Sequence, residues 1–380
     1  MNALESAFRG ALLEVEDPPA QSRAIDGVAP ALQVRARTPA ETAAALRLAA
    51  EHDAAVVPWG GGTQMGLGMP PERYDLALDL TGLNRVVEYE PADLTVTVEA
   101  GIRLADLQQA LAERRQWLPL DPPLPLEATI GGILATNASG PARYRHGTAR
   151  DLVIGMTVAL PNGELVKSGG RVVKNVAGYD MAKLHIGALG TLGMIVQVTF
   201  KVAPLPARSE AVAVTGPLAD VMSINARLHD SGLPLQALVL SNVAGPVWRL
   251  LVRFAAGEAA VERALRDLRL LISDFPGLTT SAGTVSELEL LRPAVRAEAG
   301  GDVVLRASIA PAAAEEVIGL FAARQALTAA YPASCVVYGR WPAAKGILAA
   351  SVRELRASVE ELGGSLVVEA APPGLKAEAG

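Results

Sequence analysis

A glycine-rich loop follows a predicted strand near the N-terminus and restricts the folds open to this chain. The strand covers residues 54–58, and the loop, Pro-Trp-Gly-Gly-Gly-Thr-Gln-Met-Gly-Leu-Gly, covers residues 58–68. Consecutive glycines let the backbone turn sharply, and their N–H groups can form a nest for a phosphate. A dinucleotide-binding Gly-x-Gly-x-x-Gly is excluded because its sixth position is Met65 and because Pro70 and Pro71 prevent a helix from following. A P-loop is excluded because no Gly-Lys-Ser/Thr ends the loop, which leaves another type of phosphate loop or an ordinary turn.

Predicted strands and helices alternate along the chain, and a stiff segment divides them into two regions. Ala203-Pro204-Leu205-Pro206 is expected to be extended, so we place the domain boundary after residue 206. The first domain then covers residues 1–206 and the second residues 207–372, and residues 373–380 form a frayed tail. In the second domain we predict helices over residues 217–230, 259–273, 312–328 and 348–362, between apolar strands. This order predicts an antiparallel α+β domain of ferredoxin-like type.

Composition excludes several classes of protein. The net charge of −6 argues against a nucleic-acid-binding surface, which needs a basic patch. Cys335 is the only cysteine, which excludes an internal disulfide and favours a buried, inert thiol in a reducing compartment. The four histidines include no His-x-x-His pair, so we predict no metal site. No apolar run reaches the ~18 residues of a membrane span, and the first residues do not resemble a secretory signal. We therefore expect a cytoplasmic protein that is peripheral to the inner membrane, if at all, through partner subunits.

A second motif, residues 129–140, is rich in small side chains. Its sequence is Thr-Ile-Gly-Gly-Ile-Leu-Ala-Thr-Asn-Ala-Ser-Gly. Thr129 is suited to cap a short helix whose second and third positions are Gly131 and Gly132. Free N–H groups at that end, with no side chains in the way, favour a surface for a flat ring or a phosphate. The alternative is a tight contact between helix and sheet.

Two further motifs carry polar side chains. Residues 143–151 contain Arg145 and His146, which are suited to stabilise negative charge on a bound group, although a solvated basic turn has the same composition. Residues 169–181 place Lys174 and Asn175 within an apolar stretch, where such side chains need partners. The glycines of residues 187–193 indicate a close backbone approach before the next strand.

These four motifs, in this order and spacing, resemble the flavin domain of the vanillyl-alcohol oxidase/p-cresol methylhydroxylase superfamily. More narrowly, Gly170-x-x-x-Lys174-Asn175-Val176-Ala177-Gly178-Tyr179-Asp180 is similar to the FAD-binding subunit of bacterial glycolate oxidase. The resemblance covers residues 32–206 and fades in the second domain. It implies a two-part FAD-binding domain followed by an α+β cap or substrate domain. Covalently flavinylated members carry a histidine where this chain has Thr63-Gln64, so the resemblance implies FAD that is not covalently bound.

The resemblance also implies roles for individual residues. Residues 60–66 would hold the FAD pyrophosphate, residues 129–140 would line the ribityl chain and isoalloxazine, and Ile195 would meet the cofactor through its backbone. The full set of expected cofactor-binding residues is Pro58, Trp59, Gly60, Gly61, Gly62, Thr63, Gln64, Gly66, Thr129, Gly131, Gly132, Ala135, Asn137, Ser139, Gly140, Arg145, His146, Gly147 and Ile195. Catalytic residues are not identified. The candidates are Arg340, as a guanidinium for a substrate carboxylate, with His146 and Lys174.

Two functions remain open at this stage. In the first, the chain oxidises glycolate or a similar 2-hydroxy acid, such as D-lactate, by hydride transfer to flavin while a base takes the hydroxyl proton. In the second, it is a non-catalytic electron relay or scaffold beside a catalytic paralogous FAD subunit and an iron–sulfur subunit. The scarcity of histidines in the second domain favours the relay. A serine hydrolase is excluded because the chain has no Gly-x-Ser-x-Gly.

Overall fold

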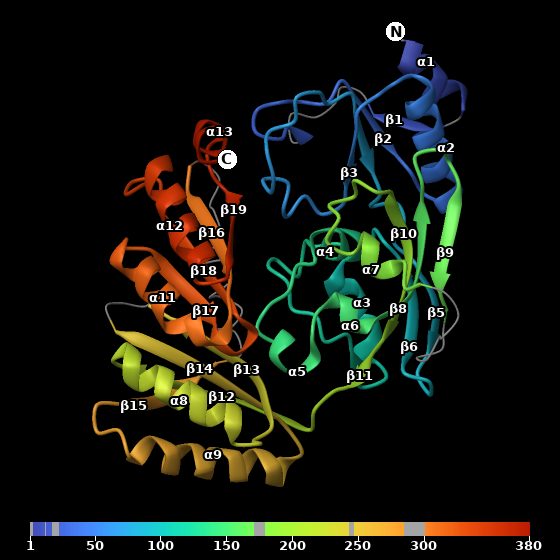
Figure 1. Ribbon diagram of the computed structural model, residues 1–380. Helices are drawn as coiled ribbons and strands as arrows, with labels where there is room; N and C mark the ends of the chain where they lie inside the picture. The colour runs from blue at the N-terminus through green and yellow to red at the C-terminus, as the bar shows by residue number, and fades with distance from the viewer. Residues whose placement is uncertain (1–2, 12, 17–22, 171–178, 243–246, 285–300) are drawn as a thin grey trace. The chain divides into compact units, whose positions relative to one another are not determined.

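The chain separates into two compact units in the computed structural model (Figure 1). The structure describes residues 3–11, 13–16, 23–170, 179–242, 247–284 and 301–380. The first unit comprises residues 1–65, 70–140 and 147–205. The second comprises residues 66–69, 141–146 and 206–380, so two short segments from inside the first region join the second unit.

The first unit contains a small sheet whose central strands are parallel. Its order is β1-β2-β4-β3, with β1 antiparallel to β2. The strands are β1 (Glu14–Glu16), β2 (Leu32–Arg35), β3 (Val56–Trp59) and β4 (Leu76–Asp79). Helices α1 (Ala3–Gly10) and α2 (Pro39–Glu51) bury their apolar side chains with one face of this sheet. Thr38 caps α2 by accepting a hydrogen bond from the Glu41 amide, and Pro39 takes the first helical position, as the sequence predicts.

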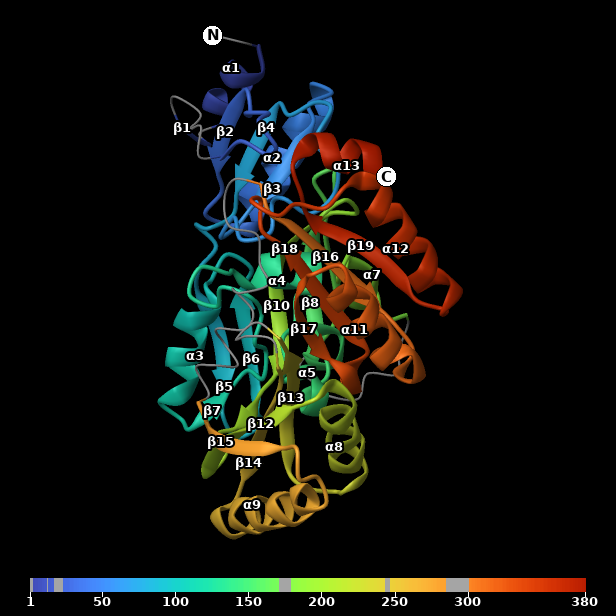
Figure 2. The ribbon, with the colours of Figure 1, turned by 90° about the vertical axis from the view of Figure 1, so that its left-hand side faces the viewer.

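A second sheet of the same unit is antiparallel and has the order β5-β6-β10-β8-β9 (Figure 2). The strands are β5 (Val86–Glu90), β6 (Thr95–Glu99), β8 (Val153–Ala159), β9 (Leu165–Gly169) and β10 (Met194–Lys201). The helices of this part are α3 (Leu104–Ala112), α4 (Ile130–Thr136), α6 (Ala149–Leu152) and α7 (Ala182–His185). A two-stranded pair, β7 (Gln116–Trp117) and β11 (Ala203–Pro204), precedes the second unit. One apolar cluster joins α3 and α4 to β6, β8 and β10, which fixes α4 on the sheet.

The second unit is built from two successive β-α-β-β-α-β repeats. The first is β12 (Arg208–Gly216), α8 (Leu218–Asp230), β13 (Leu235–Ser241), β14 (Trp248–Ala256), α9 (Glu258–Ser273) and β15 (Thr279–Gly283). The second is β16 (Val303–Ser308), α11 (Ala314–Ala323), β17 (Leu327–Tyr331), β18 (Val336–Trp341), α12 (Ala349–Glu361) and β19 (Ser365–Ala370). The sheet order β15-β12-β14-β13-β17-β18-β16-β19 gives each repeat the ferredoxin-like arrangement, and the repeats join where β13 pairs with β17. The predicted α+β class is therefore confirmed.

Two local predictions for the second unit differ from the structure. The helix predicted over residues 312–328 ends at Ala323, because Gln325 is left-handed with φ 58° and the Ala326 amide closes back onto the Phe321 carbonyl. Residues 327–331 instead form β17, in the middle of the sheet. The tail predicted to fray forms a further helix, α13 (Pro373–Ala379). The Arg356 guanidinium donates to the carbonyls of Ala379 and Gly380 and so holds its last turn.

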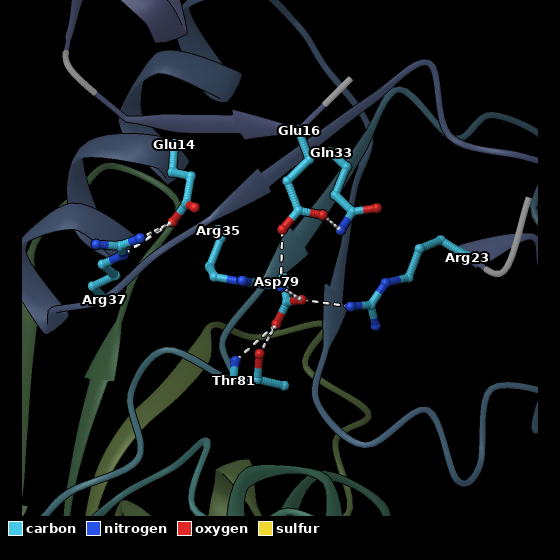
Figure 3. Close-up of polar contacts among 8 residues, drawn as sticks. All are labelled: Glu14, Glu16, Arg23, Gln33, Arg35, Arg37, Asp79 and Thr81. Carbon is cyan, nitrogen blue, oxygen red and sulfur yellow. Dashed lines mark hydrogen bonds and ion pairs between the residues drawn. The ribbon is translucent and has the colours of Figure 1, made fainter. Parts of the chain in front are cut away.

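A buried carboxylate organises the small sheet on the face opposite α2 (Figure 3). Asp79, at the end of β4, is fully buried. One of its oxygens accepts a hydrogen bond of 2.5 Å from Arg23 Nη2 and lies 3.6 Å from Arg35 Nη2. The other accepts from the amide and the hydroxyl of Thr81, at 2.8 and 2.7 Å. The strand end, the N-terminal segment and the turn after β4 are thereby held together by one side chain.

Removing this carboxylate tests its structural role. We expect Asp79→Ala to lower the free energy of unfolding by about 3 kcal/mol, because it leaves buried donors and partly buried guanidinium groups without their partner. Urea unfolding followed by circular dichroism measures the change. Arg37→Ala is the matched control, because its ion pair with Glu14 in the same region is mostly exposed and should cost within about 0.5 kcal/mol. Equal stability of the two variants would contradict this role.

Candidate functional site

The glycine loop after β3 packs with its backbone directly on another segment of the first unit. A Cβ placed on Gly60 would lie 2.2 Å from Thr129 Oγ1, and one on Gly61 would lie 1.9 Å from the Glu127 carbonyl oxygen. Gly61 is against backbone and so requires glycine, whereas a Cβ on Gly60 would require the Thr129 side chain to move. The loop and the segment that leads into the second motif are therefore in close contact.

The start of α4 shows two different uses of glycine. Thr129 caps the helix by accepting from the Gly132 amide at 3.4 Å, as predicted. Gly131 lies against the sheet, with its amide 2.6 Å from the Ala100 carbonyl, so it serves the tight contact between helix and sheet. A Cβ on Gly132 would meet only Thr129 Oγ1, at 3.3 Å, so this position leaves an accessible surface. The contact between helix and sheet thus accounts for Gly131, and the ligand surface at Gly132 stays a prediction.

A cavity of about 610 Å³ opens between these two motifs, which is within the usual range for a small-molecule site. Its lining is Gly60, Gly61, Thr81, Asn84, Gly101, Arg103, Asp106, Glu127 and Thr129. The charged residues in this set are one arginine and two carboxylic acids, so net charge does not favour an anion here. A phosphate at this loop would have to be bound by backbone N–H groups, as in a nest.

A second cavity, of about 470 Å³, also borders the loop. It is lined by Glu16, Arg23, Ala24, Gln33, Trp59, Gly61, Gly62 and Met65, so Gly61 contributes to both cavities. The guanidinium of Arg23 lies 4.7 Å from the centre of the Trp59 ring, and the Trp59 indole N–H donates to the Tyr74 hydroxyl. Arg23 and Asp79 thus support the wall of this cavity as well as the sheet (Figure 3).

The end of α4 carries a polar atom that lacks a partner. Asn137 ends the helix in the left-handed conformation, with φ 50°. The amides of Gly187 and Leu189 donate to carbonyls of α4, so the fourth motif packs against this helix end. Asn137 Oδ1 and His185 Nδ1 are both buried here, and neither has a hydrogen-bond partner among the described residues. Burial lowers the pKa of His185, so its imidazole is neutral at pH 7. Two buried polar atoms without partners fit a polar ligand at this helix end.

Other expected cofactor residues have structural partners in the first unit. The Gly140 amide donates to Asp121 Oδ1 at 3.0 Å, and a Cβ on Gly140 would lie 2.1 Å from the Asp121 carbonyl oxygen. Ser139 is buried beside it. Ile195 is buried on β10 opposite Val158. Packing therefore explains the glycine at position 140, whereas Pro58, Thr63, Gln64, Gly66 and Ala135 are all partly exposed.

The third motif is divided between the units: its first part forms α5 (Arg143–His146) in the second unit, and residues 147–151 belong to the first. Burial lowers the pKa of His146, and the charges of Arg145 and Arg253 lower it further. The imidazole is therefore neutral at pH 7 and is suited to donate a hydrogen bond rather than to supply a positive charge. Gly147 follows with φ 77°, and a Cβ there would clash with the Asp151 carboxylate.

The remaining catalytic candidates have different outcomes. Arg340 Nε donates to Asp302 Oδ2 at 2.7 Å, and both side chains are about nine-tenths buried. This guanidinium is therefore held in an internal ion pair. Lys174 lies outside the described residues. Sequence reasoning missed Asp79, Thr81, Arg103 and His185. Single polar residues at the ends of strands and helices give no signal until the fold brings them together.

Comparison with known proteins agrees with this geometry. Residues 30–169 match a family described as FAD binding domain. This segment of the chain is therefore similar to an FAD-binding domain. A solved structure of p-cresol methylhydroxylase with substrate bound superposes with a TM-score of 0.76 at 14% identity, covering 97% of this chain and 89% of that one. A chitooligosaccharide oxidase superposes with a TM-score of 0.69 at 17% identity. At these identities the structures establish the fold alone.

Curated relatives share more sequence over shorter segments. Glycolate oxidase subunit GlcD of Bacillus subtilis is 35% identical over 161 residues, which are 42% of this chain and 34% of that protein. Glycolate oxidase subunit GlcE of Escherichia coli is 35% identical over 188 residues, which are 49% of this chain and 52% of that protein. A mitochondrial D-lactate dehydrogenase [cytochrome] of Arabidopsis thaliana is 30% identical over 274 residues, or 72% of this chain and 46% of that protein. The chain thus spans about half or less of each of these relatives. In the part of the chain that the structure describes, no helix is long and apolar enough to cross a bilayer.

The packing of the loop predicts how two glycine variants differ. We expect Gly61→Ala to lose bound FAD, because its methyl group displaces the loop from the 127–129 backbone, and Gly61→Asp to lose it at least as completely. Gly66→Ala should retain FAD, because a Cβ at Gly66 meets nothing within 4 Å. Flavin absorbance per mole of purified protein, with melting temperature as the folding control, measures this. Full FAD content in Gly61→Ala would contradict the assignment.

The neutral imidazole of His146 predicts a dependence of stability on pH. Its folded pKa lies below the unfolded value, so the unfolded chain binds more protons as the pH falls through the unfolded pKa near 6.5, and stability falls. We expect His146→Gln to lose less unfolding free energy than the native chain between pH 7.5 and pH 5.5. Burial raises the pKa of Glu369, which makes the folded state more stable as the pH falls. Both proteins contain Glu369, so its contribution cancels in the comparison. Identical pH profiles would contradict this environment for His146.

Proposed function

We propose that this chain is the FAD-binding subunit of an oxidoreductase that acts on glycolate or a related 2-hydroxy acid. The observation that carries the proposal is the FAD-binding domain at residues 30–169, whose curated relatives include glycolate oxidase subunits and D-lactate and D-2-hydroxyglutarate dehydrogenases. Bound FAD would supply the chemistry of hydride acceptance from the substrate Cα, giving glyoxylate from glycolate. The chain's own residues would bind the cofactor, orient the substrate and exclude water.

The residues suited to hold FAD lie in the first unit. The loop amides of residues 60–64 would bind the pyrophosphate, and Gly132 would give a flat group access to the start of α4. Asn137 Oδ1 and His185 Nδ1 would gain the hydrogen-bond partners that they lack among the described residues. Asp79 supports this arrangement indirectly, because it fixes Thr81 in the lining of the larger cavity.

We further propose that FAD is bound without a covalent link. A glucooligosaccharide oxidase of the same fold is described as carrying a 6-S-cysteinyl, 8α-N1-histidyl FAD. This chain has Thr63 and Gln64 in the loop position where covalent members carry a histidine, and its only cysteine is Cys335, in the second unit. Burial raises the pKa of the Cys335 thiol, which disfavours the thiolate that a cysteinyl link requires.

A non-catalytic relay is the second candidate function. Within residues 206–380 the sole histidine is His229, and its ring contacts the Tyr144 hydroxyl at 3.3 Å. A histidine base for the substrate hydroxyl is therefore not evident in that region. The relatives include both GlcD and GlcE subunits of glycolate oxidases, which supports a complex with a paralogous FAD subunit. An iron–sulfur subunit would then take the electrons.

An anaerobic titration separates the two functions. Purified chain loaded with FAD is mixed with glycolate, D-lactate or D-2-hydroxyglutarate, and the visible flavin bands are followed. If the chain is catalytic, one of these acids bleaches the bands within the time of enzymatic turnover. Flavin that dithionite reduces but no 2-hydroxy acid reduces would contradict catalysis by this chain alone and support the relay. Addition of the partner subunits, with reduction restored, would place catalysis in the complex.

A further inference from the structure

The smaller cavity beside the glycine loop, of about 470 Å³, lies on the polar face of the small sheet. All its lining residues belong to the first unit. Glu16 on β1 is opposite Gln33 on β2, and side chains alternate along each strand, so both point to the face opposite α2. Trp59, at the end of β3, lies on the same face, because it is opposite Asp79. The sheet therefore supplies the floor of the cavity.

The amide of Gln33 has one fixed orientation. Its Nε2 donates to the Glu16 carboxylate, whose other oxygen accepts from Arg35 Nη2 at 2.8 Å. Because a carboxylate only accepts hydrogen bonds, the NH₂ end of the amide must face Glu16. The carbonyl oxygen, Oε1, therefore points away from Glu16, toward the side of the sheet on which Arg23 lies (Figure 3).

This carbonyl oxygen lacks a hydrogen-bond partner. Gln33 is 2% exposed, and its Oε1 accepts from no group in the described part of the chain. A buried acceptor that loses water without gaining a donor is destabilising, so such an atom indicates a missing polar group. Since Gln33 also lines the cavity, we infer that the missing group is an N–H or O–H of a molecule bound there.

Arg23 offers the complementary hydrogen bonds. Its Nη2 donates to Asp79, and its guanidinium lies 4.7 Å from the centre of the Trp59 ring, so the group is fixed on two sides. Its other N–H groups donate to no residue that the structure describes, and the side chain is 18% exposed. The cavity thus contains donors from Arg23 and an acceptor from Gln33.

The charges around the cavity are balanced. Arg23 forms an ion pair with Asp79, and Glu16 forms one with Arg35. A ligand with a net charge would therefore lose its hydration without gaining an unpaired opposite charge. A neutral group that has both an N–H and a carbonyl fits these partners better.

We propose that the smaller cavity binds a neutral, planar amide group, in which an N–H lies beside a carbonyl. The N–H donates to Gln33 Oε1, and the carbonyl accepts from Arg23. Such a group occurs as a primary carboxamide and as the lactam edge of a nucleobase. The site is separate from the 2-hydroxy acid and from FAD, although Gly61 lines both cavities and so forms a wall that they share.

Two neutral probes and one charged probe test the proposal. Nicotinamide carries a carboxamide, uracil carries lactam edges, and nicotinate has the ring of nicotinamide with a carboxylate in place of the amide. Binding to the FAD-loaded chain is measured by ligand-observed NMR titration. We expect nicotinamide or uracil to bind, and the tighter of the two identifies the kind of amide. Nicotinate should bind at least about 10-fold more weakly, because it has no N–H for Gln33 and carries a charge.

Variants of the lining locate the binding. Gln33→Met removes the acceptor at nearly constant volume, and Ala24→Phe fills the cavity from a partly exposed position. Each should weaken the tighter probe at least about 10-fold. Gln116→Met is the matched control, because Gln116 is also a buried glutamine of the first unit, but both ends of its amide are bonded, to Tyr89 and Pro91. It should lower the melting temperature and keep native affinity for the probe.

Three results would overturn the inference. The first is a native chain that binds neither neutral probe, and the second is one that binds nicotinate as well as nicotinamide. The third is native affinity in Gln33→Met. Displacement of the probe by added FAD would also contradict a separate site, because it would assign the cavity to the cofactor. None of these results depends on whether a 2-hydroxy acid reduces the flavin, so the proposed function is tested independently.

Discussion

The close contact of Gly60 and Gly61 with residues 127–129 is the constraint on which the first unit depends. It places the loop after β3 against the start of α4, although these segments belong to different sheets of the unit. A Cβ at Gly61 would clash with the Glu127 backbone, and one at Gly60 would clash with the Thr129 hydroxyl. The larger cavity beside the loop, the cap on α4 and the accessible position at Gly132 all follow from this contact. Packing therefore explains the glycines at positions 60 and 61, and the phosphate-loop interpretation stays a prediction.

Buried charge is used in the same way in both units. In the first, Asp79 satisfies the Thr81 amide and hydroxyl and the Arg23 guanidinium, and so holds the turn that lines the cavity. In the second, the Asp302 carboxylate accepts a hydrogen bond from Arg340, and the Glu369 carboxylate accepts one from Arg306. A buried pair is evidence of a defined geometry rather than of stability, because desolvation offsets much of its attraction.

Much of the fold and part of the site could be predicted from the sequence. Local signals were sufficient for the strand and loop at residues 54–68, for Thr129 as a helix cap and for the ferredoxin-like class of the second domain. They failed at β17, because the alanine-rich segment before Tyr331 has helical propensity and only the left-handed turn at Gln325 ends the helix. They also gave no sign that Asp302 neutralises Arg340, which only the folded structure shows. The sequence did not predict that the β-α-β-β-α-β unit occurs twice, because the two copies share their topology but no repeated sequence pattern.

The most direct test of the central claim is the flavin content of the purified chain. The chain is incubated with FAD, freed of excess cofactor by gel filtration and precipitated with acid, and the supernatant is analysed by absorbance and chromatography. The account predicts stoichiometric FAD in the supernatant, released intact and identical to free FAD. Flavin that stays with the precipitate would contradict non-covalent binding. A colourless chain that takes up no FAD, while circular dichroism shows it to be folded, would contradict the assignment of residues 58–66 and 129–140 as a cofactor site.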